Sequence, residues 1–296
     1  MLDQAGRLQT TVNAFCLIDE QTTLEHARAA ENRYADGNPK GLVDGVPVGV
    51  KDVFYTPMWP TLRGSRVVDP KPSMGKDSPA TRALERHGYV PLGKTTTPEL
   101  GWKGVTDSPL CGITRNPWDP DKTPGGSSGG SGAAVALGMG PLALGTDAGG
   151  SIRIPAGFCG VVGFKPTFGE VPHWPASPFG NLAHGGPMAW TVADCALLMN
   201  VLTEADARDS QAAPRRHVDY LQAIEGGIEG LKVAFSPTLG YVEVNREVAE
   251  AVAAAARTLE ALGAHVVETD PGFAEPLAAF GHLFYGGAAN AMREIG

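Results

Sequence analysis

Residues 122–167 read KTPGGSSGGSGAAVALGMGPLALGTDAGGSIRIPAGFCGVVGFKPT and place two glycine- and serine-rich turns on either side of an apolar segment. The first turn spans residues 124–131, the second spans residues 145–151, and the apolar segment between them covers residues 133–144. Glycines at this density let a backbone approach a ligand closely and present its N–H groups. We therefore expect a site built from main-chain N–H groups, with serine hydroxyls on the turns as candidate nucleophiles.

The segments around this stretch alternate between helical and strand-like patterns. An apolar run at residues 46–50 leads into Lys51, and Ser78-Pro79 has the form of a helix cap followed by proline. The expected helices are residues 23–36, 80–87, 192–203, 246–262 and 286–294, and the expected strands are residues 46–50, 89–92, 231–235 and 265–268. This alternation predicts an α/β fold with a mixed, largely parallel central sheet covered by helices on both faces.

The composition favours a globular protein that acts on small molecules. Of 296 residues, 43% are hydrophobic, which is enough for a substantial core, and we expect a single domain over residues 1–296. The formal charge of −8, without a dense Lys/Arg run, argues against nucleic-acid and membrane partners. Residues 1–13 lack the pattern of a secretory signal, so we expect a cytoplasmic protein.

The spacing of cysteine and histidine predicts no metal site. The 4 cysteines form no CxxC pair, and the 7 histidines show no ligand spacing. We expect buried free thiols, and neither a metal nor an organic cofactor.

Other interpretations of the first turn fit the sequence less well. A flexible linker would not run into an apolar segment. A phosphate-binding loop needs Lys-Ser or Lys-Thr after its last glycine, whereas Gly130 is followed by Ser131-Gly132. The glycine spacing of a dinucleotide-binding motif is absent. The GxSxG pattern at residues 125–129 leaves open a nucleophile elbow with Ser127 as the nucleophile. That alternative leaves Lys51 and the second turn without a role. Its downstream acid and histidine would be Asp194 or Asp206 and His265 or His282.

A Ser-Ser-Lys system uses both turns and the lysine, and here the sequence resembles the amidase signature family. The segments that carry the resemblance are GVPVGVKD at 45–52, GKTTTPELGW at 93–102, RNPWD at 115–119, PGGSSGGS at 124–131 and GTDAGGSIRIPAGFCGVVGFKPT at 145–167. Ser127 and Ser151 lie 24 positions apart, which fits the spacing in that family. The resemblance implies the amidase signature fold.

The resemblance also implies roles for individual residues. Ser151 would be the nucleophile, Ser127 a bridging serine after a cis peptide bond at Gly126-Ser127, and Lys51 the general base. A free lysine, with a pKa of ~10.4, is charged and cannot accept a proton, so we expect Lys51 to be desolvated or to lie near other donors. Its position at the end of an apolar strand favours this.

Further residues are assigned around these three. We expect an oxyanion hole from the N–H groups of Ala148, Gly149, Gly150 and Ser151. Side chains that brace the turns would be Ser128, Thr146, Asp147 and Arg153, although Asp147 and Arg153 fit a plain ion pair equally well. Members of the family line part of the acyl pocket with the segment that here contains Phe168, His173, Trp174, Phe179 and Asn181.

The expected activity is hydrolysis of a linear carboxamide through a Ser151 acyl-enzyme. The alternative is the A subunit of a tRNA-dependent amidotransferase, although residues 173–186 do not look like its glutaminase segment. Family members are usually considerably longer, so we expect the chain to lack the C-terminal part of the fold. A homodimer would cover the core exposed in this way.

Overall fold

The computed structural model describes residues 1–214 and 218–293, and the chain divides into two compact units. Unit 1 contains Met1–Leu221 together with the chain from Phe284 onward, and unit 2 contains Gln222–Leu283. No helix in the described part of the chain is long and apolar enough to span a bilayer. Every residue of the two glycine-rich turns lies in unit 1.

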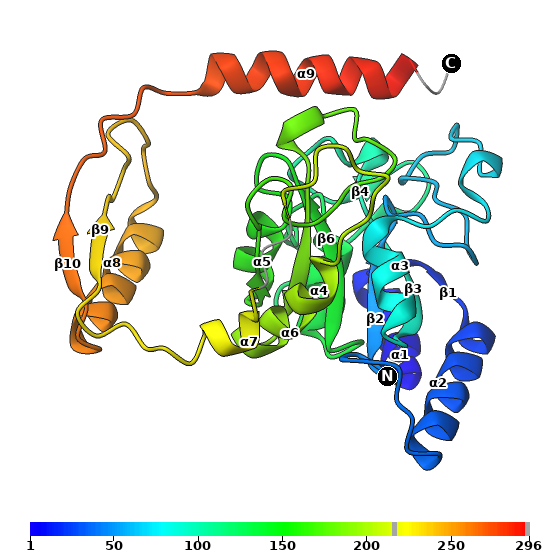
Figure 1. Cartoon of the computed structure of the whole chain (residues 1–296). Helices are drawn as coiled ribbons and strands as arrows, with labels where there is room; N and C mark the ends of the chain where they lie inside the picture. The colour runs from blue at the N-terminus through cyan, green and yellow to red at the C-terminus, as the bar shows by residue number, and fades with distance from the viewer. Residues whose placement is uncertain (215–217, 294–296) are drawn as a thin grey trace. The chain divides into compact units, whose positions relative to one another are not determined.

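A mixed sheet forms the centre of unit 1 (Figure 1). Its order is β1-β3-β2-β6-β8-β7. The strands are β1 (Phe15–Ile18), β2 (Pro47–Lys51), β3 (Val90–Thr95), β6 (Leu142–Asp147), β7 (Val162–Gly163) and β8 (His184–Ala189). β2 pairs in parallel with β3 and with β6, whereas the outer pairs are antiparallel. The prediction of a mixed α/β sheet is confirmed, with the parallel pairing confined to its centre.

Helices cover both faces of this sheet. On one face, α3 (Pro79–Arg86) and α6 (Val192–Leu202) pack Leu84 and Leu198 against Val48 and Val50 of β2. On the other face, α1 (Leu2–Val12) and α4 (Gly129–Ala136) contribute to a second apolar cluster. Figure 1 shows these helices around the strands. Burial of both faces explains why β2 consists of almost continuous apolar residues.

The remaining elements connect this core. In unit 1 they are α2 (Glu20–Ala35), α5 (Arg153–Cys159), the β4–β5 hairpin (Asp107–Ser108 and Gly112–Ile113) and short 3-10 turns η1 (Lys71–Ser73), η2 (Glu99–Gly101) and η3 (Gly180–Leu182). Helices α7 (Tyr220–Ala223) and α9 (Leu277–Arg293) each include residues of both units. Helix α9 begins nine residues before the helix expected at residues 286–294, and residue 294 of that expected range lies outside the described residues. Helix α1 and strands β1 and β8 had no sequence-based prediction.

Unit 2 has its own simple topology. Parallel strands β9 (Lys232–Phe235) and β10 (His265–Glu268) are connected by α8 (Arg246–Ala261). These bounds agree closely with the pattern in the sequence, where Gly263 follows the helix in a left-handed conformation with φ of 94°.

The central stretch folds as a turn, a buried helix and a central strand. Every residue of α4 is buried, and a Cβ atom at Gly130 would lie 2.4 Å from the nitrogen of Thr96 and 2.5 Å from the carbonyl oxygen of Ala14. A Cβ at Gly126 would similarly lie 2.6 Å from the carbonyl group of Val105. These glycines therefore permit close packing inside the protein, in addition to any approach of a ligand.

Candidate active site

Lys51 is the last residue of β2, and its side chain is fully buried. Its Nζ lies 2.7 Å from Ser127 Oγ, 2.9 Å from Ser128 Oγ and 2.8 Å from Thr146 Oγ1. The parallel pairing of β2 with β6 explains this meeting, because Thr146 lies near the carboxyl end of β6. The structure thus brings the predicted lysine together with the first serine turn and the strand that leads into the second turn.

Burial dominates the electrostatics of this amine. Desolvation lowers the pKa of Lys51 to about 7, and the negative charge of Asp147 opposes that shift. A substantial fraction of Lys51 is therefore neutral at neutral pH. A neutral amine has a lone pair and can accept a proton from a neighbouring hydroxyl.

The two serines of the first turn, Ser127 and Ser128, make different contacts. The Gly126-Ser127 peptide bond is cis, as expected, and Ser127 is buried beside Lys51. The backbone N–H of Ser128 donates to the carbonyl oxygen of Ser151 over 3.1 Å, and its hydroxyl donates to the carbonyl oxygen of Thr146 over 3.2 Å. Ser128 therefore ties the first turn to the second.

Asp147 organises the second turn. Its carboxylate accepts hydrogen bonds from the backbone N–H of Gly150 at 2.7 Å and of Ile152 at 3.1 Å, and from the Arg153 guanidinium at 2.9 and 3.0 Å. Burial opposes the charged carboxylate, but the Arg153 and backbone hydrogen bonds outweigh it and lower the pKa of Asp147 to about 2. The ion pair and the bracing role therefore coexist.

The hydrogen bonds of Asp147 remove Gly150 from the four expected oxyanion donors. The N–H of Gly150 is directed to Asp147 Oδ1, so it is already engaged. Ala148 is partly accessible and Gly149 is exposed, and both lie on the turn that leads to Ser151. Ala148, Gly149 and Ser151 are thus the candidate donors that this carboxylate does not occupy.

A pocket in unit 1 opens over the two serines. Ser127, Thr146, Asp147, Ala148 and Ser151 all contribute to its lining. Among the described residues, the hydroxyl of Ser151 has no hydrogen-bond partner within the protein. This side chain is partly accessible, so its hydroxyl is free to turn toward a bound molecule.

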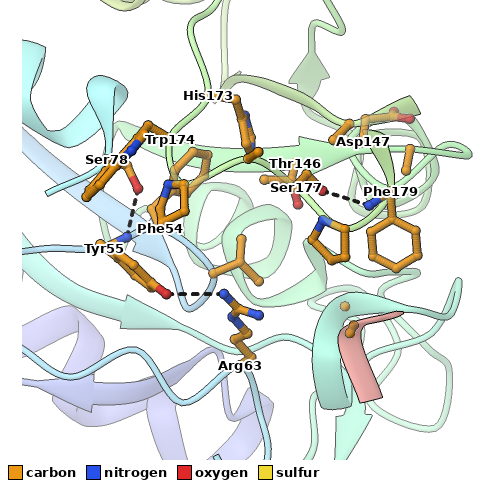
Figure 2. Close-up of a pocket in the computed structure, with 18 of the residues that line it drawn as sticks. Phe54, Tyr55, Arg63, Ser78, Thr146, Asp147, His173, Trp174, Ser177 and Phe179 are labelled. Atoms are coloured by element: carbon orange, nitrogen blue, oxygen red, sulfur yellow. Dashed lines mark hydrogen bonds between the residues drawn. The ribbon is translucent and has the colours of Figure 1, made fainter. Parts of the chain in front are cut away.

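Three of the five predicted pocket residues line the pocket. They are His173, Trp174 and Phe179, as Figure 2 shows. Phe168 lies outside the lining because its ring packs edge-on against His184, with ring centroids 5.9 Å apart. Asn181 also lies outside it, because η3 leaves this residue exposed to solvent.

Several lining residues had no prediction from the sequence. They are Val53, Phe54, Tyr55, Arg63, Ser78, Pro79, Leu100, Gly101 and Ala291. The position of Phe54 and Tyr55 three and four residues after Lys51 was the available signal. Arg63 gave none, because its local sequence does not indicate the left-handed φ angle of 54° that the residue adopts.

The acid and histidine candidates of the nucleophile-elbow alternative do not line this pocket. Asp194 accepts from the Thr191 hydroxyl at the start of α6, and Asp206 forms an ion pair with Arg208 at 2.6 Å. Neither carboxylate contributes to the pocket lining. His265 and His282 belong to unit 2. Within residues 1–214 and 218–293, no group of three His, Cys, Asp or Glu side chains could hold a metal ion.

The chain belongs to the amidase signature family. The family profile described as Amidase matches residues 1–296. Among solved structures, a bacterial aryl acylamidase of the amidase signature family superposes with a TM-score of 0.92 at 34% identity, covering 99% of this chain and 62% of that one. For a 6-aminohexanoate cyclic dimer hydrolase, the TM-score is 0.89 at 30% identity, covering 100% of this chain and 62% of that one.

Curated relatives carry a different name. The A subunit of glutamyl-tRNA(Gln) amidotransferase from Chloroflexus aurantiacus is 41% identical over 275 residues, which cover 90% of this chain and 55% of that protein. Its counterpart from Coxiella burnetii is 38% identical, again covering 90% of this chain and 55% of that protein. The chain thus spans about half the length of the curated relatives it matches. Amidase signature enzymes include both amide hydrolases and amidotransferases.

The role of Asp147 in holding the second turn is testable by Asp147→Asn. The native pKa of about 2 lies below the ordinary value, so the carboxylate stabilises the fold above pH ~4, and this contribution is lost as pH falls toward 2. We expect Asp147→Asn to lower the free energy of unfolding by about 1.5–3 kcal/mol at neutral pH, and by less near pH 3. Urea denaturation at several pH values measures both effects.

The matched control is Asp121→Asn, because Asp121 is exposed. It should change the free energy of unfolding by less than about 0.5 kcal/mol at every pH. An Asp147→Asn variant as stable as the control at neutral pH would contradict the proposed bracing.

Proposed function

We propose that this chain is the catalytic part of an amide hydrolase in which Ser151 attacks a carboxamide carbonyl. The observation that carries the proposal is a buried amine, Lys51, 2.7 Å from the hydroxyl of Ser127 beside a pocket that also contains Ser151. A serine hydroxyl needs a partner that takes its proton, and a neutral lysine can serve in place of a histidine.

The hydrogen-bond geometry supports a relay through Ser127. A neutral amine has two hydrogens, yet Nζ contacts three hydroxyls, so at least one hydroxyl must donate to the nitrogen lone pair. Ser128 can donate to the carbonyl oxygen of Thr146, which leaves Ser127 at the shortest distance as the donor to Nζ. Ser127 Oγ then has a free lone pair with which to accept the proton of Ser151.

The reaction follows from this arrangement in two halves. As Ser151 Oγ bonds to the carbonyl carbon, its proton passes to Ser127 Oγ while the Ser127 proton passes to Lys51. Ser127 then gives a proton to the leaving nitrogen, and Lys51 returns a proton to Ser127. The C–N bond breaks to give an acyl-enzyme. Water enters by the same relay and releases the acid. No step requires a metal or an organic cofactor.

The second turn supports the negative oxygen of the tetrahedral intermediate. The N–H groups of Ala148, Gly149 and Ser151 are the proposed donors, since Gly150 donates to Asp147. Losing one oxyanion donor in an acyl-transfer enzyme costs about 10²–10³ in rate. Asp147 would contribute indirectly, by fixing the backbone that presents these donors.

The walls of the pocket fit a small carboxamide. Phe54, Trp174 and Phe179 offer apolar surface near the serines, and Arg208 stacks over the Trp174 ring at 4.5 Å. A linear amide with an aliphatic or aryl group is therefore the proposed substrate, and no nucleic acid is needed for this reaction. The similarity to the aryl acylamidase structure supports the same substrate class.

One observation favours a second candidate function. The identity of 41% to the A subunit of glutamyl-tRNA(Gln) amidotransferase favours a protein that works with partner chains and tRNA. A solved structure of this amidotransferase component from Thermotoga maritima superposes with a TM-score of 0.82 at 32% identity, covering 100% of this chain and 62% of that one. The higher TM-score of 0.92 for the aryl acylamidase favours the stand-alone hydrolase.

The nucleophile can be located by an acylating probe. We expect a fluorophosphonate to add one adduct, mapped to Ser151 by peptide mass spectrometry, because this hydroxyl lies in the pocket beside the relay. Ser151→Ala should abolish the adduct and lower amide turnover by about 10³-fold or more. Ser210→Ala, which alters an exposed serine, should behave as wild type. An adduct on Ser127 would support the elbow mechanism and overturn this proposal.

The pH dependence of kcat/KM reports the protonation of Lys51. Since only the neutral amine accepts a proton, activity should rise with pH to a plateau above about 7 and fall about tenfold per pH unit below that value. Lys51→Arg stays charged and should be inactive throughout this range. An activity that is flat between pH 5 and 9, or that survives in Lys51→Arg, would exclude the amine as the base.

Purification separates the two candidate functions. The stand-alone hydrolase should be active on acetanilide and simple aliphatic amides as an isolated polypeptide. The amidotransferase component should instead copurify with partner chains from its native host, and release ammonia from glutamine only with them. Ammonia release from glutamine but from no other amide would favour the amidotransferase.

A further inference from the structure

Arg63 places a guanidinium in the same pocket as the two serines. It lies in the loop that follows β2, and it lines the pocket together with Leu100, Gly101 and Ser127. Its backbone is held in place, because the N–H of Leu100 donates to the carbonyl oxygen of Arg63 over 2.7 Å. Figure 2 shows the guanidinium directed toward the interior of the pocket, beside the phenol of Tyr55.

The backbone of Arg63 adopts a conformation that arginine rarely takes. Its φ is 54°, in the left-handed region, where a side chain with a Cβ costs energy. Leu100, its hydrogen-bond partner, shares this feature with φ of 55°. Residues of this kind are found preferentially at functional sites, where the surrounding structure holds them in place.

The guanidinium of Arg63 has most of its donors unused. It donates one hydrogen bond, over 3.3 Å, to the hydroxyl of Tyr55. In the described part of the chain no carboxylate lies within ion-pair distance of it. By contrast, Arg153 pairs with Asp147 at 2.9 Å and Arg208 pairs with Asp77 at 2.8 Å. Arginine presents five N–H donors, and a partly buried one normally finds an anionic partner.

The charges around the pocket leave Arg63 unbalanced. Asp147, the acidic residue of the lining, is already neutralised by Arg153. Burial lowers the pKa of His173, which keeps this ring neutral at neutral pH, although Asp209 opposes the shift. The lining therefore offers one positive group that no carboxylate of residues 1–214 and 218–293 pairs with.

We propose that Arg63 and Tyr55 bind a carboxylate carried by the substrate, so that the preferred amides bear a negative charge away from the scissile bond. This proposal rests on the proposed amide hydrolysis. Because Tyr55 accepts from Arg63 at 3.3 Å, its own O–H hydrogen is free to donate to the same carboxylate.

A carboxylate fits this pair better than a phosphate does. The planar fork of a guanidinium matches the two oxygens of a carboxylate, and such charge-assisted hydrogen bonds are about twice as strong as neutral ones. A phosphate dianion would call for further cationic donors, and Arg63 supplies the only such group among the described lining residues. Aromatic side chains, Phe54 and Trp174 among them, suit the hydrocarbon between the two ends of the substrate.

The experiment compares matched amides on matched variants. One series contains the monoamides of linear dicarboxylic acids from malonic to adipic acid, and its neutral partners are alkyl amides of equal chain length. A second series contains N-acetyl amino acids and the corresponding N-alkyl acetamides. The first series places the carboxylate on the acyl side of the scissile bond, and the second places it on the amine side.

In wild type, we expect at least one series to show kcat/KM about tenfold to hundredfold higher for the charged amide than for its neutral partner. Arg63→Gln should remove that preference, Arg63→Lys should retain part of it, and Tyr55→Phe should reduce it less than Arg63→Gln does. Glutamine also carries a Cβ, so it meets the same φ cost as arginine and the fold is kept. The control is Arg66→Gln, because Arg66 is exposed in the same loop and lies outside the pocket lining.

Two outcomes would overturn the proposal. One is a wild-type enzyme that hydrolyses neutral amides at least as well as charged ones in both series. The other is a preference that persists unchanged in Arg63→Gln. If wild type hydrolyses no amide at all, the proposed function fails first, and calorimetry with glutarate and adipate then tests Arg63 separately. Dicarboxylate binding that is weakened about tenfold or more by Arg63→Gln, but not by Arg66→Gln, supports the site. No measurable binding by wild type contradicts it.

Discussion

The removal of Lys51 from water is the constraint on which the site depends. A charged amine with no solvent contact is costly when no carboxylate of the described residues lies within ion-pair distance, so burial shifts the equilibrium of Lys51 toward the neutral form. Three hydroxyls, from Ser127, Ser128 and Thr146, satisfy the nitrogen without supplying a counter-charge. A carboxylate in the same place would hold the amine in its charged form and prevent it from acting as a base. The chemistry therefore follows from which partners the sheet brings to the end of β2.

The same scaffold fixes the two serine turns by different means. The first turn relies on space, because Gly126 and Gly130 let the chain pass within contact of the backbone at Val105 and Thr96. The second turn relies on charge, since the Asp147 carboxylate collects backbone N–H groups and the Arg153 guanidinium. Both devices hold the turns rigid, so the proposed proton relay and oxyanion donors need no large rearrangement. Electrostatic stabilisation of this preorganised kind is usually the largest contribution to acyl-transfer catalysis.

Local patterns in the sequence predicted the elements and the residues that lie within continuous motifs. The apolar run of β2 and the cap of α3 belong to this group, because periodicity and capping are read from a few consecutive residues. The contact between Lys51 and Ser127 also belongs to it, because short motifs around each residue carry the family resemblance. The far wall of the pocket was not predictable. A backbone hydrogen bond joins Arg63, in the loop after β2, to Leu100 in η2, two segments that are far apart in the sequence, and both residues have left-handed φ angles. Similarly, Asn181 lies in the expected loop, but a 3-10 turn directs it to solvent.

The protonation state of Lys51 distinguishes the Ser-Ser-Lys mechanism from the nucleophile elbow. The first needs a neutral amine at Lys51, whereas the second gives this residue no role and allows it to stay charged. The most direct measurement is a ¹⁵N NMR titration of the lysine side chains, in which the Lys51 signal is identified by its absence from Lys51→Met. The account predicts a midpoint near 7. A midpoint close to ~10.4, the value of a lysine in water, would contradict it.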